Sequence, residues 1–315
     1  MRAALAFTAA LAAALVLAGA AQASPAPVDT PMTESQPPRP PALNHVYIVV
    51  DGPTFEALRD SPELADLLGS TDGGLPDYAS PAPDADRVFF RGRQTYLEIF
   101  APDNRFNEPV GKVGLGLGLD TPDDFEAVEQ AWWKHCGDRA RRTPIDYRRT
   151  TPPTPWYDAV QCNDTAAGPE LAVWAMVYRP EFQRWQAGAA PSISPVTRRA
   201  DILAPRASAG QGRFDIAGLT LALSVDLRDR VIDQLVAAGF DRRDHPDSIV
   251  LEGDGLEVRL LTASDTTGLR ALQLIVASDS FESLALGAAI LTTGGPGLAT
   301  LRLSPVQPPT VQEEP

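Results

Sequence analysis

Two cysteines and three histidines are the only side chains in this 315-residue sequence that offer thiolate or imidazole ligands to a metal. That number is too small for a zinc cluster built from several such ligands. Cys136 and Cys162 form either one disulfide bridge or two buried free thiols, and we expect the bridge. It would close a loop of about 25 residues and add on the order of 3 kcal/mol of stability. The sequence has no Gly-x-Ser-x-Gly nucleophile motif and no His-Glu-x-x-His metal motif.

Three glycines alternate with leucines between Val113 and Leu119. Successive side chains of a strand point to opposite faces, so Gly114, Gly116 and Gly118 leave one face bare while the leucines pack on the other. A bare strand face admits either a ligand or another part of the protein. We interpret the three glycines as part of a ligand pocket, and close packing of a neighbouring helix is the alternative. The string lacks the spacing of a phosphate-binding loop.

Positive charge is scarce but concentrated. The chain has 27 Lys and Arg against 41 Asp and Glu, a formal net charge of −14. Such an acidic balance argues against sequence-independent nucleic-acid binding and against an electrostatic anchor on anionic lipid. Five arginines gather in one short segment: Arg139, Arg141, Arg142, Arg148 and Arg149. They either bind an anionic ligand or form a solvated face balanced by Asp138 and Asp146.

The elements that must position these residues follow a repeated order. An apolar strand over residues 45–50 runs into a helix start at Asp51-Gly52-Pro53, and the strand over 113–119 runs into a similar start at Thr121-Pro122. Residues 96–100 and 171–178 are further predicted strands. A third unit begins with a strand over 216–224, continues with a helix that ends at Gly239, and includes a hairpin around residues 253–255.

Six segments follow from these patterns. The start of the chain combines Arg2, an apolar run and Ala21-Gln22-Ala23, which predicts a signal peptide cleaved before Ser24; an uncleaved anchor is the alternative. The predicted segments are a signal peptide over 1–23, a Pro-rich disordered tether over 24–43, paired modules over 44–185, a linker over 186–212, a third module over 213–304 and a tail over 305–315. The expected location is the periplasm or the outside of the cell, without membrane attachment after cleavage.

The strand–helix–three-strand order resembles the vicinal-oxygen-chelate superfamily, which includes glyoxalase I and extradiol dioxygenases. The block from Asn44 to Asp51 and the later block from Thr95 to Phe100 carry the resemblance. The sequence is also similar to an uncharacterised family of exported bacterial glyoxalase-like proteins. The resemblance implies an α+β fold in which repeated βαβββ modules form curved mixed sheets, with a third, looser module at the C-terminus.

In active members of that superfamily, a divalent metal is held by a histidine near the start of each module's first strand and a glutamate on its last strand. The resemblance makes His45 and Glu98 the metal ligands, with Glu98 also the candidate catalytic base. At the position that matches His45, the second module has Gly114 and the third has Thr220. A catalytic zinc site normally has at least three protein ligands. The alternatives are a hydrogen-bonded strand-end histidine and a glutamate that is exposed or paired with an arginine.

We therefore predict an exported small-molecule-binding protein of glyoxalase-like fold with a degenerate metal site. Its ligand-binding residues would be His45, Glu98, Gly114, Gly116 and Gly118. The first alternative is a metal-dependent lyase, isomerase or dioxygenase of the same superfamily. The second is a non-catalytic envelope protein that docks another protein through its third module. The sequence leaves open the identity of the ligand, the binding of a divalent metal and the oligomeric state.

Overall fold

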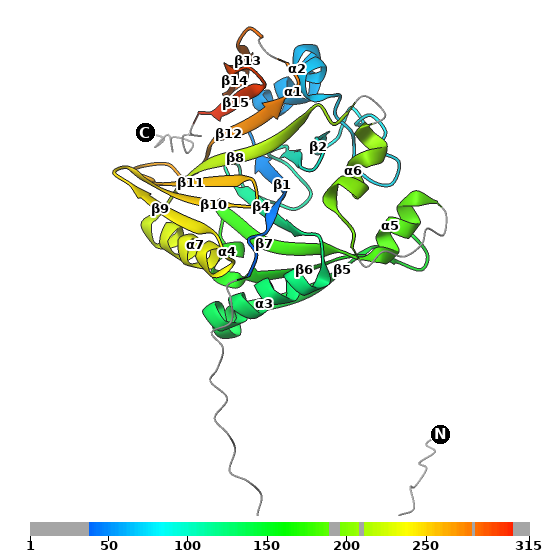
Figure 1. The fold of residues 1–315 in the computed structure, drawn as a ribbon. Coiled ribbons are helices and arrows are strands. Elements are labelled where there is room, and N and C mark those ends of the chain that lie inside the picture. The colour runs from blue at the N-terminus through cyan, green and yellow to red at the C-terminus, as the bar shows by residue number, and fades with distance from the viewer. Residues whose placement is uncertain (1–37, 189–195, 208–210, 279–280, 305–315) are drawn as a thin grey trace, which may run out of the picture. The chain divides into compact units, whose positions relative to one another are not determined.

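The computed structural model describes residues 38–188, 196–207, 211–278 and 281–304, and these residues form two mixed β-sheets with helices around them (Figure 1). The first sheet has the strand order β2-β3-β1-β4-β7-β6-β5. Its strands are β1 (Ala42–Val49), β2 (Arg87–Arg91), β3 (Tyr96–Phe100), β4 (Val113–Leu119), β5 (Ala140–Tyr147), β6 (Thr154–Cys162) and β7 (Leu171–Tyr178).

The second sheet has the order β13-β14-β15-β12-β8-β11-β10-β9. Its strands are β8 (Phe214–Leu223), β9 (Asp241–His245), β10 (Ser248–Gly253), β11 (Leu256–Thr262), β12 (Gly268–Val276), β13 (Leu284–Leu286), β14 (Ala289–Gly295) and β15 (Leu298–Leu303). The helices are α1 (Gly52–Asp60), α2 (Pro62–Leu68), α3 (Pro122–Cys136), the 3-10 turn η1 (Gly137–Arg139), α4 (Asn163–Ala166), α5 (Pro180–Ala187), α6 (Arg199–Ala207) and α7 (Val225–Ala237).

The strand connections confirm the predicted class of repeated βαβββ modules in curved mixed sheets. In the second module β4 lies parallel to β7, and β6 and β5 follow by antiparallel pairing. The third module repeats this order with β8 parallel to β11, followed by β10 and β9. In the first module β1 is parallel to β3, and an isolated bridge between Asp72 and Phe89 stands where a further strand would be. Antiparallel pairing of β1 with β4 joins the first two modules.

The helix starts form as their sequences predict. The Asp51 carboxylate accepts the Thr54 backbone N–H and begins α1, and the Thr121 hydroxyl accepts the Asp124 N–H and begins α3. Helices α3 and α7 lie side by side beneath the two sheets (Figure 1), where the Trp132 indole N–H donates to the Gln234 carbonyl at 2.9 Å. This contact joins the second module to the third.

One hydrophobic core takes side chains from both sheets and from α1, α3 and α7. Leu115, Leu117 and Leu119 of β4 belong to it, so the leucine face of that strand packs inward as predicted. The opposite face of the first sheet, which carries His45, Glu98 and the three glycines, is therefore the face available for a site.

Two predicted segments differ from the structure. The predicted tether over 24–43 is packed from Pro38 onward in the described residues: Ala42 and Leu43 are buried in β1, and the Pro38 carbonyl lies against Gly239. The predicted linker over 186–212 contains α6, whose Ile202 and Leu203 are buried. Short runs with few apolar residues, as in both segments, carry little periodic signal.

The predicted third module over 213–304 contains more than one unit. β8 to β11 already complete a βαβββ module because β9, an exposed polar strand, supplies the strand missing from the sequence pattern. β12 to β15 then extend the same sheet by antiparallel pairing. The predicted segments 1–23 and 305–315 lie outside the described residues. None of the helices described is long and apolar enough to span a bilayer.

Candidate functional site

A cavity of about 320 Å³ lies against the first sheet, on the face opposite the main core. Its walls come from β2, β3, β5, β6 and β7, from α5 and α6, and from the loop before β2. The lining residues are Leu75, Tyr78, Arg87, Phe89, Arg91, Tyr96, Glu98, Asp146, Tyr147, Arg148, Arg149, Trp156, Tyr178, Phe182, Ile202 and Leu203. Ligand pockets typically have volumes of roughly 300–1,000 Å³, so this cavity suits one small molecule.

Strand alternation explains which side chains reach the cavity. In β2, Arg87, Phe89 and Arg91 point to the cavity while Val88 and Phe90 enter the main core. In β3, Tyr96 and Glu98 point the same way. The backbone register pairs His45 with Tyr96 and Tyr47 with Glu98, so β1 presents its own polar side chains on this face.

His45 is buried among neighbouring side chains. Its ring stacks on Tyr96 with a centroid distance of 4.4 Å and meets the edge of Trp174 at 5.2 Å. Its Nδ1 lies 2.8 Å from Asn44 Oδ1 and donates to it, because that oxygen can only accept. Burial, and secondarily the charge of Arg91, lower the pKa of His45 to about 3. The imidazole is therefore neutral near pH 7. His45 is not among the residues that line the cavity.

Glu98 lines the cavity and is paired with an arginine. The Arg87 Nη1 donates to Glu98 Oε1 at 2.9 Å, and the carboxylate is only 7% exposed. Burial raises the pKa of Glu98, although Arg87 and Arg91 act in the opposite direction. The pairing with an arginine is one of the alternatives that the sequence left open.

The residues present do not fit the divalent metal that the resemblance implies. Within the part of the chain that the structure describes, no group of three metal-binding side chains contains His45 or Glu98. The single group of that kind is Cys136, Cys162 and Asp164, and its two sulfurs are joined in a disulfide. Because His45 and Glu98 have no third metal-binding side chain beside them in the described residues, we derive no chemical step through a metal.

The three glycines of β4 make room for side chains of the protein. A methyl group on Gly114 would lie 1.9 Å from the Tyr47 ring, and one on Gly116 would lie 2.7 Å from the His45 ring. Above Gly118 the same position is 2.7 Å from the Arg199 side chain of α6. The glycines thus let aromatic and long polar side chains lie flat across the sheet, and they are not among the lining residues of the cavity.

A buried ion pair supports the cavity, and sequence reasoning missed it. Arg91 Nε and Nη2 donate to the two carboxylate oxygens of Asp72 at 3.1 and 3.3 Å. The guanidinium lies 4.2 Å from the Phe89 ring centroid and 4.5 Å from that of Tyr96. The alternation Arg-Val-Phe-Phe-Arg in β2 was the available signal, because it places both arginines on one face.

The arginine cluster divides into two groups. Arg139 pairs with Asp164, and Arg142 pairs with Glu129 and Asp158, away from the cavity. Arg148 and Arg149 line the cavity instead, at its exposed side. The predicted disulfide between Cys136 and Cys162 is present, and it ties the end of α3 to the end of β6 with the Cα atoms 6.0 Å apart.

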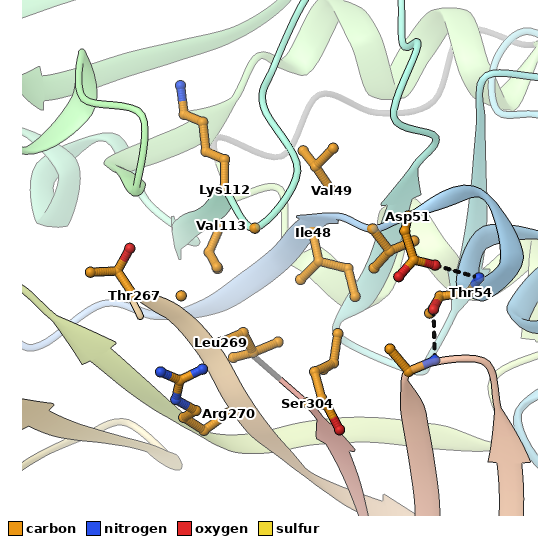
Figure 2. A pocket seen from close by; sticks show the side chains of 15 residues that line it. Ile48, Val49, Asp51, Thr54, Lys112, Val113, Thr267, Leu269, Arg270 and Ser304 are labelled. Carbon is orange, nitrogen blue, oxygen red and sulfur yellow. Dashed lines mark hydrogen bonds between the residues drawn. The ribbon is translucent and has the colours of Figure 1, made fainter. Parts of the chain in front are cut away.

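A smaller cavity of about 30 Å³ lies between the sheets and has room for one or two waters (Figure 2). Its polar groups are already bound: Asp51 caps α1, and the Thr54 hydroxyl accepts the Ala288 N–H at 2.8 Å. Figure 2 shows the Lys112 ammonium directed away from the other labelled side chains, and that group pairs with Glu108. We assign this cavity no ligand.

Comparisons with known proteins extend over most of the chain. A family model described as a family of unknown function, DUF5829, matches residues 43–299, and no curated protein matches the sequence. A hypothetical protein from Staphylococcus aureus has a crystal structure that is similar at a TM-score of 0.50 and 11% identity, over 79% of this chain and 96% of that one. At such low identity the likeness concerns the fold alone.

Two dioxygenases are more distant matches. The halotolerant catechol dioxygenase BphC matches at a TM-score of 0.41 and 11% identity, over 76% of this chain and 71% of that one. A variant of homoprotocatechuate 2,3-dioxygenase from B. fuscum matches at 0.38 and 13%, over 74% of this chain and 56% of that enzyme. This chain therefore spans little more than half of the second dioxygenase.

Proposed function

Because this chain belongs to DUF5829, a family of unknown function, we propose its function from the geometry of the cavity: it binds one small organic molecule there, without a metal. The observation that carries the proposal is the 320 Å³ cavity, whose lining combines seven aromatic side chains with charged groups. Apolar walls supply most of the affinity in such pockets, and a few polar groups orient the ligand.

The surroundings of Glu98 and His45 favour ligand binding over metal-dependent catalysis. A catalytic metal site normally has at least three protein ligands, and among the described residues no third metal-binding side chain stands with His45 or Glu98. Releasing Glu98 for a metal would leave the partly buried Arg87 guanidinium without its counter-ion, which is unfavourable. We therefore propose metal-free binding ahead of the metal-dependent lyase, isomerase or dioxygenase.

A cavity-filling substitution tests the binding function. Leu203 of α6 lines the cavity and packs against Phe89 and Tyr96, so Leu203→Trp places a large ring in the binding space. We expect the wild type to bind anilinonaphthalene sulfonate with a rise in its fluorescence, and Leu203→Trp to weaken that binding by about tenfold or more. Val236→Trp, at an exposed position on α7, is the matched control and should bind as the wild type does.

Two results would contradict the proposal. One is equal binding by the wild type and by a folded Leu203→Trp variant, checked by circular dichroism. The other is one equivalent of a divalent metal that co-purifies with the wild type and is lost in His45→Ala.

We also propose that the protein is exported and works in the periplasm or outside the cell. The N-terminal sequence has the charge, apolar run and small-residue site of a signal peptide. The Cys136–Cys162 disulfide supports an oxidising compartment, because such bonds are rare in the cytosol. Mass spectrometry of the protein from its native cells should find a mature chain that starts at Ser24, in the periplasmic or culture fraction. A cytosolic chain that retains residues 1–23 would refute export.

A further inference from the structure

The charges around the cavity are distributed unevenly between its buried and exposed ends. The buried end contains Arg91 and Glu98, which are 6% and 7% exposed. The exposed end contains Asp146, Arg148 and Arg149, which lie at and just after the end of β5. A bound molecule would therefore meet two different electrostatic environments along its length.

The buried end is electrically balanced by the protein itself. Arg91 is neutralised by Asp72 through two hydrogen bonds, and Glu98 is neutralised by Arg87 at 2.9 Å. A further charge placed there would be desolvated without a counter-ion, which is strongly unfavourable. The aromatic rings Phe89, Tyr96, Tyr178 and Phe182 supply the rest of the surface at this end and around it, and they favour an apolar body.

The exposed end carries two arginines without an acidic partner in the described residues. Among the described residues Arg148 and Arg149 form no ion pair; Arg149 Nη1 donates to the Leu75 carbonyl at 3.0 Å, and the Arg149 guanidinium also lies beside the Tyr147 hydroxyl. Both guanidinium groups are thus available to a ligand, although the protein as a whole is acidic. Two adjacent arginines are well suited to bind a carboxylate through charge-assisted hydrogen bonds.

A buried hydrogen-bond donor of the cavity lining independently indicates a ligand with an acceptor oxygen. The Trp156 indole nitrogen is buried and has no hydrogen-bond partner in the part of the chain that is described, and Trp156 lines the cavity. An indole N–H can only donate. A ligand that carries an acceptor oxygen would satisfy this donor, and buried donors are rarely left unpaired.

We propose that the ligand is an amphipathic organic monoanion, bound with its apolar body at the buried end and its carboxylate at Arg148 and Arg149. This rests on the binding function proposed above. It also gives a role to the two cluster arginines that face the cavity.

Three probes with the same ring system test the charge preference: naphthoate, naphthalenemethanol and naphthylmethylamine. Isothermal titration calorimetry of the full mature chain should show that naphthoate binds about tenfold more tightly than the alcohol, and the amine most weakly. The double variant Arg148→Gln/Arg149→Gln should bind naphthoate about tenfold more weakly and the alcohol unchanged. Arg141→Gln, which removes an exposed arginine of β5 that does not line the cavity, is the matched control and should change neither.

The outcomes separate this inference from the binding function. If the alcohol or the amine binds at least as tightly as naphthoate and Leu203→Trp abolishes that binding, the cavity binds ligands but the anion preference is wrong. The same holds if the double variant binds naphthoate as tightly as Arg141→Gln does. If none of the three probes binds the wild type, the inference fails together with the proposed function.

Discussion

Acidification should destabilise the wild-type protein far more than a variant that lacks His45. In an unfolded chain a histidine has a pKa near 6.5, whereas burial and the charge of Arg91 lower the pKa of His45 to about 3 in the folded state. Between these values the unfolded chain binds the proton and the folded chain does not, so stability is lost as the pH falls from 6.5 towards 3. The expected loss is about 1.4 kcal/mol per pH unit, or roughly 4 kcal/mol over the whole window.

Chemical denaturation at roughly pH 7 and pH 4 measures this effect as a difference between two proteins. His45→Phe keeps a flat ring on Tyr96 and cannot titrate, so the free energy of unfolding should fall by about 3 kcal/mol less over that interval than in the wild type. Glu98, whose raised pKa acts in the opposite direction, is present in both proteins and cancels.

An NMR titration provides a second measurement that does not depend on the variant. The ring signals that are lost in His45→Phe should remain those of neutral imidazole down to roughly pH 4. A His45 ring that titrates near its ordinary pKa, or equal pH slopes for the two proteins, would show that the imidazole is solvated in the folded state.

The local pattern of the sequence predicts the face that carries the site, but not its contents. Alternation in β4 correctly assigns Leu115 and Leu117 to the core and clears the opposite face at Gly114 and Gly116. The alternation does not predict which side chains cover that face, because those side chains come from other elements. Tyr47 and His45 of β1 reach over the glycines through an antiparallel register that only the folded sheet defines.

The cavity itself depends on contacts between residues that are distant in the sequence. Its lining includes Ile202 and Leu203, two apolar residues in a segment whose sequence predicts a linker. Its ion pair joins Asp72, in an irregular loop, to Arg91 across the β-bridge with Phe89. Periodicity predicts elements and faces, whereas pairings between distant residues require the topology. This is why strands were predicted more reliably than the site.

The buried pair of Asp72 and Arg91 should be the most sensitive polar contact in this site. Asp72→Asn keeps the size of the side chain and one oxygen acceptor, but it leaves the Arg91 guanidinium buried without a counter-charge. Removing one partner of a buried pair typically costs about 3–5 kcal/mol, and we expect a loss of that size in the free energy of unfolding, measured by urea denaturation. Asp229→Asn, which breaks the surface pair with Arg228, should change stability by less than about 0.5 kcal/mol.

A double variant separates the charge effect from damage to the loop. In Asp72→Asn/Arg91→Met neither member of the pair carries a charge, and the thioether fills space between Phe89 and Tyr96, so much of the lost stability should return. If the double variant is no more stable than Asp72→Asn, the cost comes instead from the Gly74 N–H, which donates to Asp72 Oδ1 at 2.7 Å and shapes the turn. Wild-type stability in Asp72→Asn would mean that solvent reaches Arg91. The buried end of the cavity would then no longer exclude a charged part of the ligand.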